Sequence, residues 1–138
     1  MERAFELTLK AEINEIPRVS AALEQLMQVH SFSDEEILDT QLAVEEAVTN
    51  VIMHGYEGHA GEIHLLCHAS RGIIEVQIED TAPPFNPLSI PDPDFTADVQ
   101  DRRLGGLGIF LIRRVMDDVM YRNDRGKNIL VLIKRKSG

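Results

Sequence analysis

The sequence predicts an α+β fold, a two-layer α/β sandwich in which a mixed, mostly antiparallel sheet carries helices on one face. Two long helical patterns lie in the first half of the chain, and two runs of alternating apolar and polar residues follow them. With 138 residues and 43% hydrophobic content, the chain is long enough for one ordinary core and too short for two. We therefore expect a single domain over residues 1–138.

A strand and a helix are predicted in the N-terminal part. Phe5, Leu7 and Leu9 alternate with polar neighbours as in a half-buried strand, and this run ends near Asn14. Apolar residues then recur at helical spacing up to about His30. Asn14 is a plausible N-cap for this first helix.

A second helix and a hairpin follow. Ser33 and Glu36 have the spacing of a capping box, which marks the start of a helix that should end before Gly55. The runs 62–69 and 73–79 alternate in polarity and are joined by a short glycine-containing connection. They are predicted to be central antiparallel strands.

The last part of the chain contains a long loop, a helix and a pair of strands. Residues 81–104 include five prolines and no periodic pattern. Because loops beyond about 12–15 residues inside compact domains are usually functional or disordered, we expect a lid here. Helical spacing resumes after Gly105 and Gly106, and two closing strands are predicted at 119–121 and 129–133.

The first motif with possible chemistry lies on the second helix. Glu46, Asn50 and His54 are each four residues apart, so they share one face of a helix that is apolar around most of its remainder. Such a polar stripe can simply face solvent. On a helix this apolar, however, buried polar groups must be directed at a partner or a ligand.

The second motif follows the second strand of the hairpin. Asp80 comes directly after the alternating run, and Pro84 and Phe85 lie in the proline-rich sequence behind it. An acidic residue at the end of a central strand stands where ligand sites commonly form. Asp before a proline-rich sequence is also an ordinary turn former, and both interpretations stay open for this motif alone.

The third motif is a glycine-rich run that leads directly into a helix. Glycines let backbone N–H groups approach an anion, and a helix N-terminus favours phosphate. The run lacks the Lys-Ser/Thr of a P-loop, and a loop rather than a strand precedes it, so neither a P-loop nor a Rossmann motif fits. Its residues are Gly105, Gly106, Leu107, Gly108 and Ile109.

Taken in this order, the three motifs resemble the ATP-binding domain shared by DNA gyrase, the heat-shock chaperone, sensor histidine kinases and the mismatch-repair ATPase. Within this superfamily, residues 46–50 with 54–56 resemble the helix signature of the anti-sigma-factor serine kinases, and residues 80–85 and 105–109 match the other two motifs of that family. The likeness covers nearly the entire chain and implies the Bergerat type of nucleotide-binding sandwich.

The resemblance also implies ATP and Mg²⁺ as cofactors and a role for each motif. Asn50 would hold Mg²⁺, Glu46 would orient or deprotonate the attacking hydroxyl, and Asp80 would accept a hydrogen bond from the adenine amino group. Arg103 could stabilise the γ-phosphate or meet a protein partner. The other residues implied at the nucleotide are His54, Pro84, Phe85, Gly105, Gly106, Leu107, Gly108 and Ile109.

For function, the resemblance implies an ATP-dependent serine/threonine protein kinase that is an anti-sigma factor. Such a kinase phosphorylates an anti-anti-sigma (STAS-type) partner, sequesters a sigma factor and forms a homodimer. A non-catalytic ATP-gated binding module is the alternative. The catalytic half of a sensor histidine kinase is disfavoured, because the nucleotide fold uses all 138 residues and leaves none for a phosphoacceptor domain.

Two departures from the family pattern concern the adenine end. Ala82, Pro83 and Pro84 occupy a turn that often has glycines. Asn128 stands where many members have a threonine whose hydroxyl supports the adenine-binding Asp. The amide of Asn128 could replace that hydroxyl or fail to do so, which leaves the strength of adenine recognition open.

Composition limits the partners and the compartment. The chain has 14 Lys and Arg against 23 Asp and Glu, a net charge of −9, so direct binding to nucleic acid is not expected. The single Cys67, the lack of a leader-like N-terminus and the lack of a long apolar stretch predict a cytoplasmic protein outside the membrane. His64 and His68 are expected on a solvated strand face rather than in a zinc site, and the basic run 134–136 is expected to be solvated.

Overall fold

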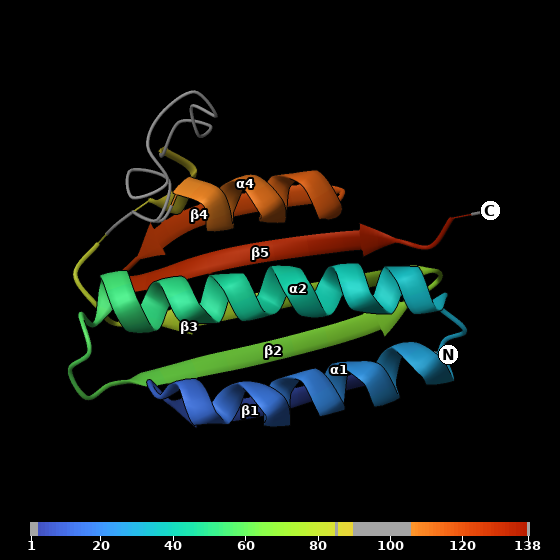
Figure 1. The fold of residues 1–138 in the computed structure, drawn as a ribbon, viewed down its shortest axis with the longest axis horizontal. Helices are drawn as coiled ribbons and strands as arrows, with labels where there is room; N and C mark the ends of the chain where they lie inside the picture. The colour runs from blue at the N-terminus through green and yellow to red at the C-terminus, as the bar shows by residue number, and fades with distance from the viewer. Residues whose placement is uncertain (1–2, 85, 90–105, 138) are drawn as a thin grey trace.

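The computed structural model describes residues 3–84, 86–89 and 106–137, which form five strands and several helices (Figure 1). The strands are β1 (Arg3–Lys10), β2 (Glu62–Ser70), β3 (Ile73–Asp80), β4 (Asp118–Asp124) and β5 (Lys127–Arg135). The α-helices are α1 (Ile16–Val29), α2 (Asp34–Asn50) and α4 (Gly106–Val115), with short helical turns η1 (Ile13–Glu15), η2 (Val51–Gly55) and η3 (Pro87–Ser89).

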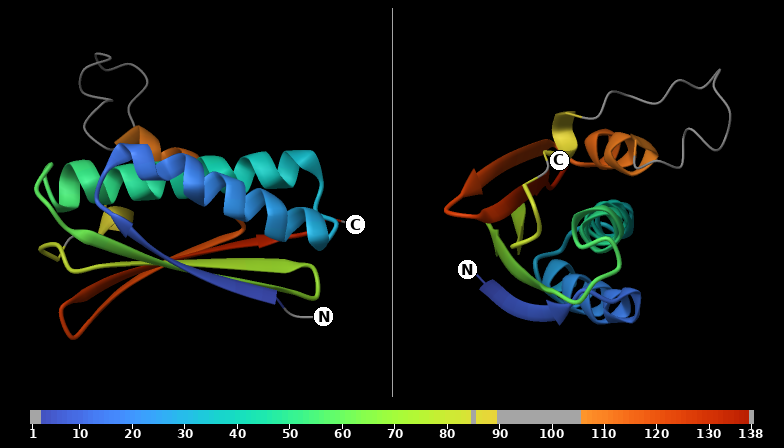
Figure 2. Two further views of the ribbon diagram at one scale, coloured as in Figure 1. Left: turned by 90° about the horizontal axis from the view of Figure 1, so that it is seen from below. Right: turned by 90° about the vertical axis from the view of Figure 1, so that its left-hand side faces the viewer.

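The strands form one sheet in the order β1-β2-β3-β5-β4, and α1, α2 and α4 cover one face of it (Figure 2). This confirms the predicted two-layer sandwich. Each of the four pairings between described strands is antiparallel, so the parallel component that the prediction allowed is absent from this part of the chain. Among the described helices, none combines the length and the apolar character that crossing a membrane requires.

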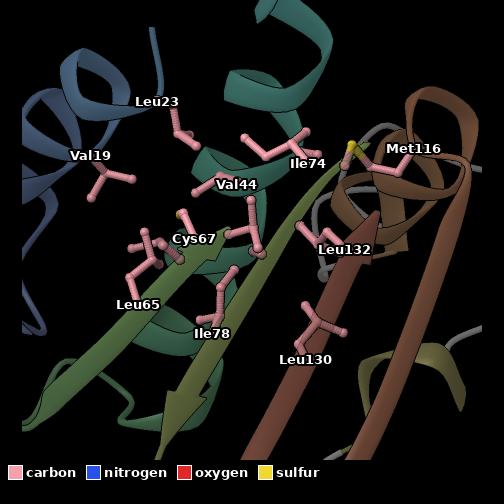
Figure 3. Close-up of a cluster of buried hydrophobic side chains, with 14 of the residues drawn as sticks. Val19, Leu23, Val44, Leu65, Cys67, Ile74, Ile78, Met116, Leu130 and Leu132 are labelled. Carbon is pink, nitrogen blue, oxygen red and sulfur yellow. The ribbon is translucent and has the colours of Figure 1, made fainter. Parts of the chain in front are cut away.

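The hydrophobic core lies between the sheet and the helices. Alternate residues of β2 and β3, such as Leu65, Cys67 and Ile78, are at most 1% exposed and point toward the helical layer (Figure 3). Val44 of α2 and Leu23 of α1 meet them from the other side. Each such side chain contributes about 1.5–3 kcal/mol through burial, which holds α2 firmly against the centre of the sheet.

Two tight hairpins set the register of the sheet. Arg71 and Gly72 between β2 and β3 have φ angles of 50° and 76°, and Arg125 and Gly126 between β4 and β5 have 52° and 84°. Two consecutive positive φ angles are typical of a type I′ turn, whose twist matches that of the flanking strands. The second hairpin corrects the predicted bounds of the last two strands, which extend to this two-residue turn.

The start of α1 differs from the prediction. Asn14 is not the N-cap, because residues 13–15 form the short 3₁₀ turn η1 and α1 begins at Ile16 with Pro17 in its first turn. The side chain of Glu15 instead accepts a hydrogen bond from the backbone N–H of Lys10, at 3.1 Å. The chain therefore turns sharply between β1 and α1 without a side-chain cap.

The start of α2 confirms the capping box. Ser33 Oγ accepts from the backbone N–H of Glu36 at 3.1 Å, and Glu36 Oε1 accepts from the N–H of Ser33 at 2.8 Å. Not every apolar residue of α2 is buried, since Leu38 is 64% exposed. The ordered start of α2 fixes the helix that carries the candidate site at its other end.

Lys134, the first residue of the basic C-terminal run, is bound rather than solvated, which corrects the prediction for this residue, whereas Arg135 and Lys136 are exposed as expected. Lys134 lies on the helix-facing side of β5, where Nζ donates to the carbonyl oxygen of Val115 at 2.6 Å and to Asp39 Oδ2 at 3.2 Å. Arg135 pairs with Asp118 at 2.5 Å. The end of β5 thereby connects α2, the end of α4 and β4.

Candidate functional site

Glu46 and Asn50 on α2 face the first turn of α4. A β-carbon placed on Gly108 would stand 3.0 Å from Glu46 Oε2 and 3.5 Å from both polar side-chain atoms of Asn50. The helix N-terminus of α4 thus lies directly beside a carboxylate and an amide. The N–H groups in the first turn of a helix have no partner within the helix, and together with the helix dipole they favour a negatively charged group in the same place.

The Glu46 carboxylate is set apart from its neighbour Glu45. Glu45 Oε1 accepts a hydrogen bond from the Ser20 hydroxyl at 2.8 Å, so this side chain links α2 to α1. Within the described residues, Glu46 has no hydrogen bond or ion pair. Burial, with a smaller contribution from the charge of Glu45, raises the pKa of Glu46 above its ordinary 4.5. A carboxylate with a raised pKa and no internal partner is suited to accept a proton.

The helical spacing changes directly after Asn50. Residues 51–55 form the π-type turn η2, in which Tyr56 N–H donates to the carbonyl oxygen of Val51 at 2.8 Å. This wider turn directs Val51 and Gly55 toward the cleft described next, and His54 is exposed outside its lining. The polar stripe predicted over three turns therefore ends at Asn50. Single π turns inside α-helices are often found at functional sites.

A cleft connects the end of α2 with the sheet. It is lined by Asn50, Val51, Gly55, Asp80, Pro87, Tyr121 and Leu130. The structure therefore brings Asn50 of the first predicted motif and Asp80 of the second to one cavity, although 30 positions separate them. Gly55 forms a close wall, since a β-carbon there would stand 3.2 Å from that of Ala82.

Asp80 is buried at the end of β3, with 8% of its surface exposed. Its Oδ1 accepts from the backbone N–H of Ala82 at 3.0 Å and from Asn128 Nδ2 at 2.9 Å. Burial raises the pKa of Asp80, and the two hydrogen bonds oppose that shift. The amide of Asn128 thus donates to Asp80 directly, as the sequence analysis allowed.

Tyr56, directly after η2, links the start of β2 to the residue that follows β3. Its hydroxyl donates to the carbonyl oxygen of Glu62 at 2.7 Å and accepts from the backbone N–H of Thr81 at 3.1 Å. Its ring lies against Gly61, so closely that a β-carbon at that position would overlap it. The segment after η2 is therefore fastened to the residue that follows Asp80.

The other predicted site residues fall into three groups. Phe85, Arg103 and Gly105, with most of the predicted lid, lie outside the described residues. Gly106 and Leu107 begin α4, as expected for the glycine-rich run. Pro84 is exposed outside the cleft lining, and Ile109 is fully buried in the core, where it anchors α4 rather than facing the cleft.

Sequence reasoning missed Tyr121, which lines the cleft and donates to Asn128 Oδ1 at 2.5 Å. No motif marks it, because the contact depends on the register between β4 and β5. The only available signal was the tyrosine at an inward position of a predicted strand.

The remaining polar candidates form no second site of this kind. His64 Nδ1 lies 3.5 Å from Glu79 and Nε2 lies 3.9 Å from Glu6, on the face of the sheet away from the helices. Among the residues that the structure describes, no group of three or more His, Cys, Asp or Glu is arranged to hold a metal ion. Cys67 is 1% exposed, and burial raises the pKa of its thiol strongly, so it is a core residue.

Comparisons with known proteins identify the family of this chain. Residues 9–134 match the family model of the histidine kinase-like ATPase domain. The chain is similar to the serine-protein kinase RsbW of Listeria innocua, with 33% identity over 132 residues that cover 92% of this chain and 83% of the relative. It is also similar to RsbW of Bacillus cereus, with 27% identity over 137 residues, 95% of this chain and 86% of the relative.

A solved structure shows the same fold. The crystal structure of the RsbU and RsbW domains of a Mycobacterium tuberculosis protein superimposes with a TM-score of 0.67 at 18% identity. The match covers 99% of this chain and 33% of that chain, so this chain spans one third of the longer protein.

Proposed function

Because the chain belongs to the histidine kinase-like ATPase domain family, and within it to the RsbW serine-protein kinases, we propose that it is an ATP-dependent serine/threonine kinase and anti-sigma factor. It phosphorylates an anti-anti-sigma partner of the STAS type and sequesters a sigma factor. The observation that carries the proposal is the Glu46 carboxylate, which has no partner among the described residues and lies beside Gly108 and Asn50, where Asn50 also lines the cleft that contains Asp80.

The adenine end of the nucleotide is assigned to Asp80. Its buried carboxylate lies in the cleft, where Oδ1 accepts from two donors and Oδ2 has no hydrogen bond from the described residues, so Oδ2 can accept from an amino group. Gly55 and Tyr121 line the same cavity. Gly55 has no side chain that would fill it, and the flat ring of Tyr121 suits contact with a planar base. Asp80 therefore recognises the base through a hydrogen bond and takes no part in bond breaking.

The phosphate end is assigned to the space between α2 and α4. Gly108 leaves this space open, and the N-terminus of α4 supplies N–H groups for phosphate oxygens. The amide oxygen of Asn50 fits Mg²⁺, which takes few protein ligands and keeps waters and phosphate oxygens. When bound, Mg²⁺ neutralises charge on the phosphates.

Glu46 is assigned the role of general base. As the serine oxygen forms its bond to the γ-phosphorus, the bond from that phosphorus to the β,γ-bridging oxygen breaks and ADP leaves with the electron pair. The hydroxyl proton passes to the Glu46 carboxylate. Its raised pKa makes it a better proton acceptor than an ordinary solvent-exposed carboxylate.

The partners follow from the same proposal. The net charge of −9 favours a basic partner, as expected for a DNA-binding sigma factor. A homodimer is also proposed. Light scattering should give twice 15.5 kDa for the dimer, whereas a mass of 15.5 kDa would contradict it.

The test of the kinase proposal is phosphotransfer from labelled ATP to the cognate anti-anti-sigma protein by the wild type, Glu46→Gln and Glu45→Gln. Glu46→Gln should keep ATP binding and lose phosphotransfer. Glu45→Gln is the matched control, because a glutamine amide oxygen can still accept from the Ser20 hydroxyl, and this variant should retain both. Absence of phosphoserine with wild type under conditions where ATP is bound would end the kinase proposal.

The alternative is an ATP-gated binding module without catalysis. The sequence feature that favours it is the asparagine at position 128, where many family members have threonine. The hydrogen bond from Asn128 to Asp80 weakens this argument. A pure binding module would keep its control of the partner unchanged in Glu46→Gln. The same variant therefore separates the two functions.

A further inference from the structure

The side chain of Asn128 is buried beneath the cleft and its amide orientation is determined by its surroundings. It is 6% exposed, and Nδ2 donates to Asp80 Oδ1 at 2.9 Å and to the carbonyl oxygen of Ala82 at 3.0 Å. A backbone carbonyl can only accept, so the NH₂ group must face this side whatever the protonation state of Asp80. The amide can therefore only donate to Asp80.

The opposite end of the amide is held equally firmly. Asn128 Oδ1 accepts from the Tyr121 hydroxyl at 2.5 Å and from Asn123 Nδ2 at 3.2 Å. Together with the two donated bonds, this uses both donors and both acceptor positions of the amide. A fully satisfied buried network of this kind is rigid, and rotating the amide would break four hydrogen bonds at once.

This network favours Asp80 as a hydrogen-bond acceptor, so that it binds a donor group of the ligand. Oδ1 receives two donors, from Asn128 and Ala82, and both favour the ionised carboxylate over the neutral acid. Within the described residues, no hydrogen bond reaches Oδ2. The carboxylate thus offers one free oxygen that can accept from an amino group, and it would repel a carbonyl oxygen placed at the same point.

We propose that Asn128 and Tyr121 are positioning residues that determine base selectivity, because they hold Asp80 as an acceptor that admits a purine with a 6-amino group and rejects one with a 6-carbonyl group. The inference rests on the proposed ATP site and deepens it. Tyr121 acts in two ways, since its hydroxyl orients the Asn128 amide and its side chain lines the cleft.

The sharpest probe compares ATP with inosine triphosphate, in which the 6-amino group of the base is replaced by a carbonyl. The dissociation constants of both nucleotides are measured by calorimetry for the wild type, Asn128→Leu, Asn128→Thr and Tyr121→Phe. Leu has nearly the shape of Asn without its polar atoms. Thr restores one hydroxyl donor, and Phe removes only the hydroxyl of Tyr121.

The wild type should prefer ATP clearly over inosine triphosphate. Asn128→Leu should lower that preference about tenfold, as expected for the loss of a buried hydrogen bond to a charged group. Tyr121→Phe should lower it in the same direction by a smaller factor, and Asn128→Thr should recover part of it. Loss of packing alone would weaken both nucleotides equally and leave their ratio unchanged.

The possible failures are distinguishable. If the wild type binds neither ATP nor inorganic tripolyphosphate, the proposed nucleotide site itself is wrong and this inference falls with it. If the wild type binds ATP but the ratio is unchanged in both Asn128→Leu and Tyr121→Phe, the inference alone is overturned. Circular dichroism checks each variant, and should Asn128→Leu fail to fold, the ratio in Tyr121→Phe decides.

Discussion

Gly108 on α4 and Glu46 on α2 approach so closely that a β-carbon on the glycine would stand 3.0 Å from the carboxylate oxygen Oε2. Few side chains tolerate such a contact without displacing their neighbour. Gly108 lies inside α4, where glycine is normally unfavourable. The glycine therefore lets α4 approach Glu46 and Asn50 closely, at a cost in helix propensity.

Gly108→Ala should weaken ATP binding several-fold and change stability little. Alanine is favoured over glycine by up to about 1 kcal/mol inside a helix, and the need to displace the Glu46 side chain opposes this gain, so unfolding in urea should shift little. Gly72→Ala is the contrasting control, because its φ of 76° strains any side chain by about 1–2 kcal/mol and it lies in a turn far from the cleft. Unchanged ATP affinity in Gly108→Ala would contradict the assignment of this space to the phosphates.

Glu46→Gln should be at least as stable as the wild type at pH 7. Burial raises the pKa of Glu46 above 4.5, so the folded state holds its proton more tightly than the unfolded state does. Stability is then lost as the pH rises from 4.5 through the raised pKa, and the ionised carboxylate destabilises the fold at neutral pH. Urea unfolding at pH 7 and at about pH 4 measures this. A variant that is clearly less stable than wild type at pH 7 would refute it.

Glu36→Gln should destabilise the protein by about 2 kcal/mol, as expected for hydrogen bonds to a charged group. The backbone N–H groups of Ser33 and Ser137 lower the pKa of Glu36 to about 2, with Ser137 N–H donating to Oε2 at 2.6 Å. The contribution is complete above pH 4.5 and is lost as the pH falls toward 2. The difference from wild type in urea unfolding should therefore shrink below pH 4.5.

The control for that variant is Glu35→Gln, which changes the same charge at an exposed neighbour. It should stay within about 0.5 kcal/mol of wild type, as surface substitutions usually do. Equal effects of the two substitutions would mean that Glu36 does not hold the C-terminal residues to α2.

Cys67 should react with iodoacetamide only when the protein opens. Its side chain is 1% exposed, and burial raises the pKa of the thiol strongly, so the native state offers almost no thiolate. The alkylation rate should rise in parallel with the unfolded fraction as urea is added. Rapid modification of the native protein in buffer would contradict the packing of β2.

The elements could be predicted from the sequence because their polarity patterns report which face is buried. The alternation in β2 and β3 and the capping box of Ser33 and Glu36 needed no tertiary information. The ends of β4 and β5 could not be predicted in this way. Their polar residues Asn123 and Asn128 serve a hydrogen-bond network across strands rather than the apolar core.

The residues of the candidate site also differ in whether the sequence could predict them. Glu46, Asn50 and Asp80 belong to recognisable motifs, whereas Tyr121 enters only through the register of two strands. The π turn over 51–55 has no polarity signal of its own, so the exclusion of His54 from the cleft required the structure. Lys134 was misjudged because a basic run near the end of a chain normally points into solvent.

The most direct test of the central claim, that a nucleotide extends from Asp80 to Asn50 with its cation at Asn50, is the Mg²⁺ dependence of ATP affinity in the wild type and Asn50→Ala. Calorimetry with Mg²⁺ and with EDTA should show a large loss of affinity on chelation for the wild type. Asn50→Ala should bind ATP weakly and equally in both conditions. An Asn50→Ala variant that keeps the full dependence on Mg²⁺ would contradict the account.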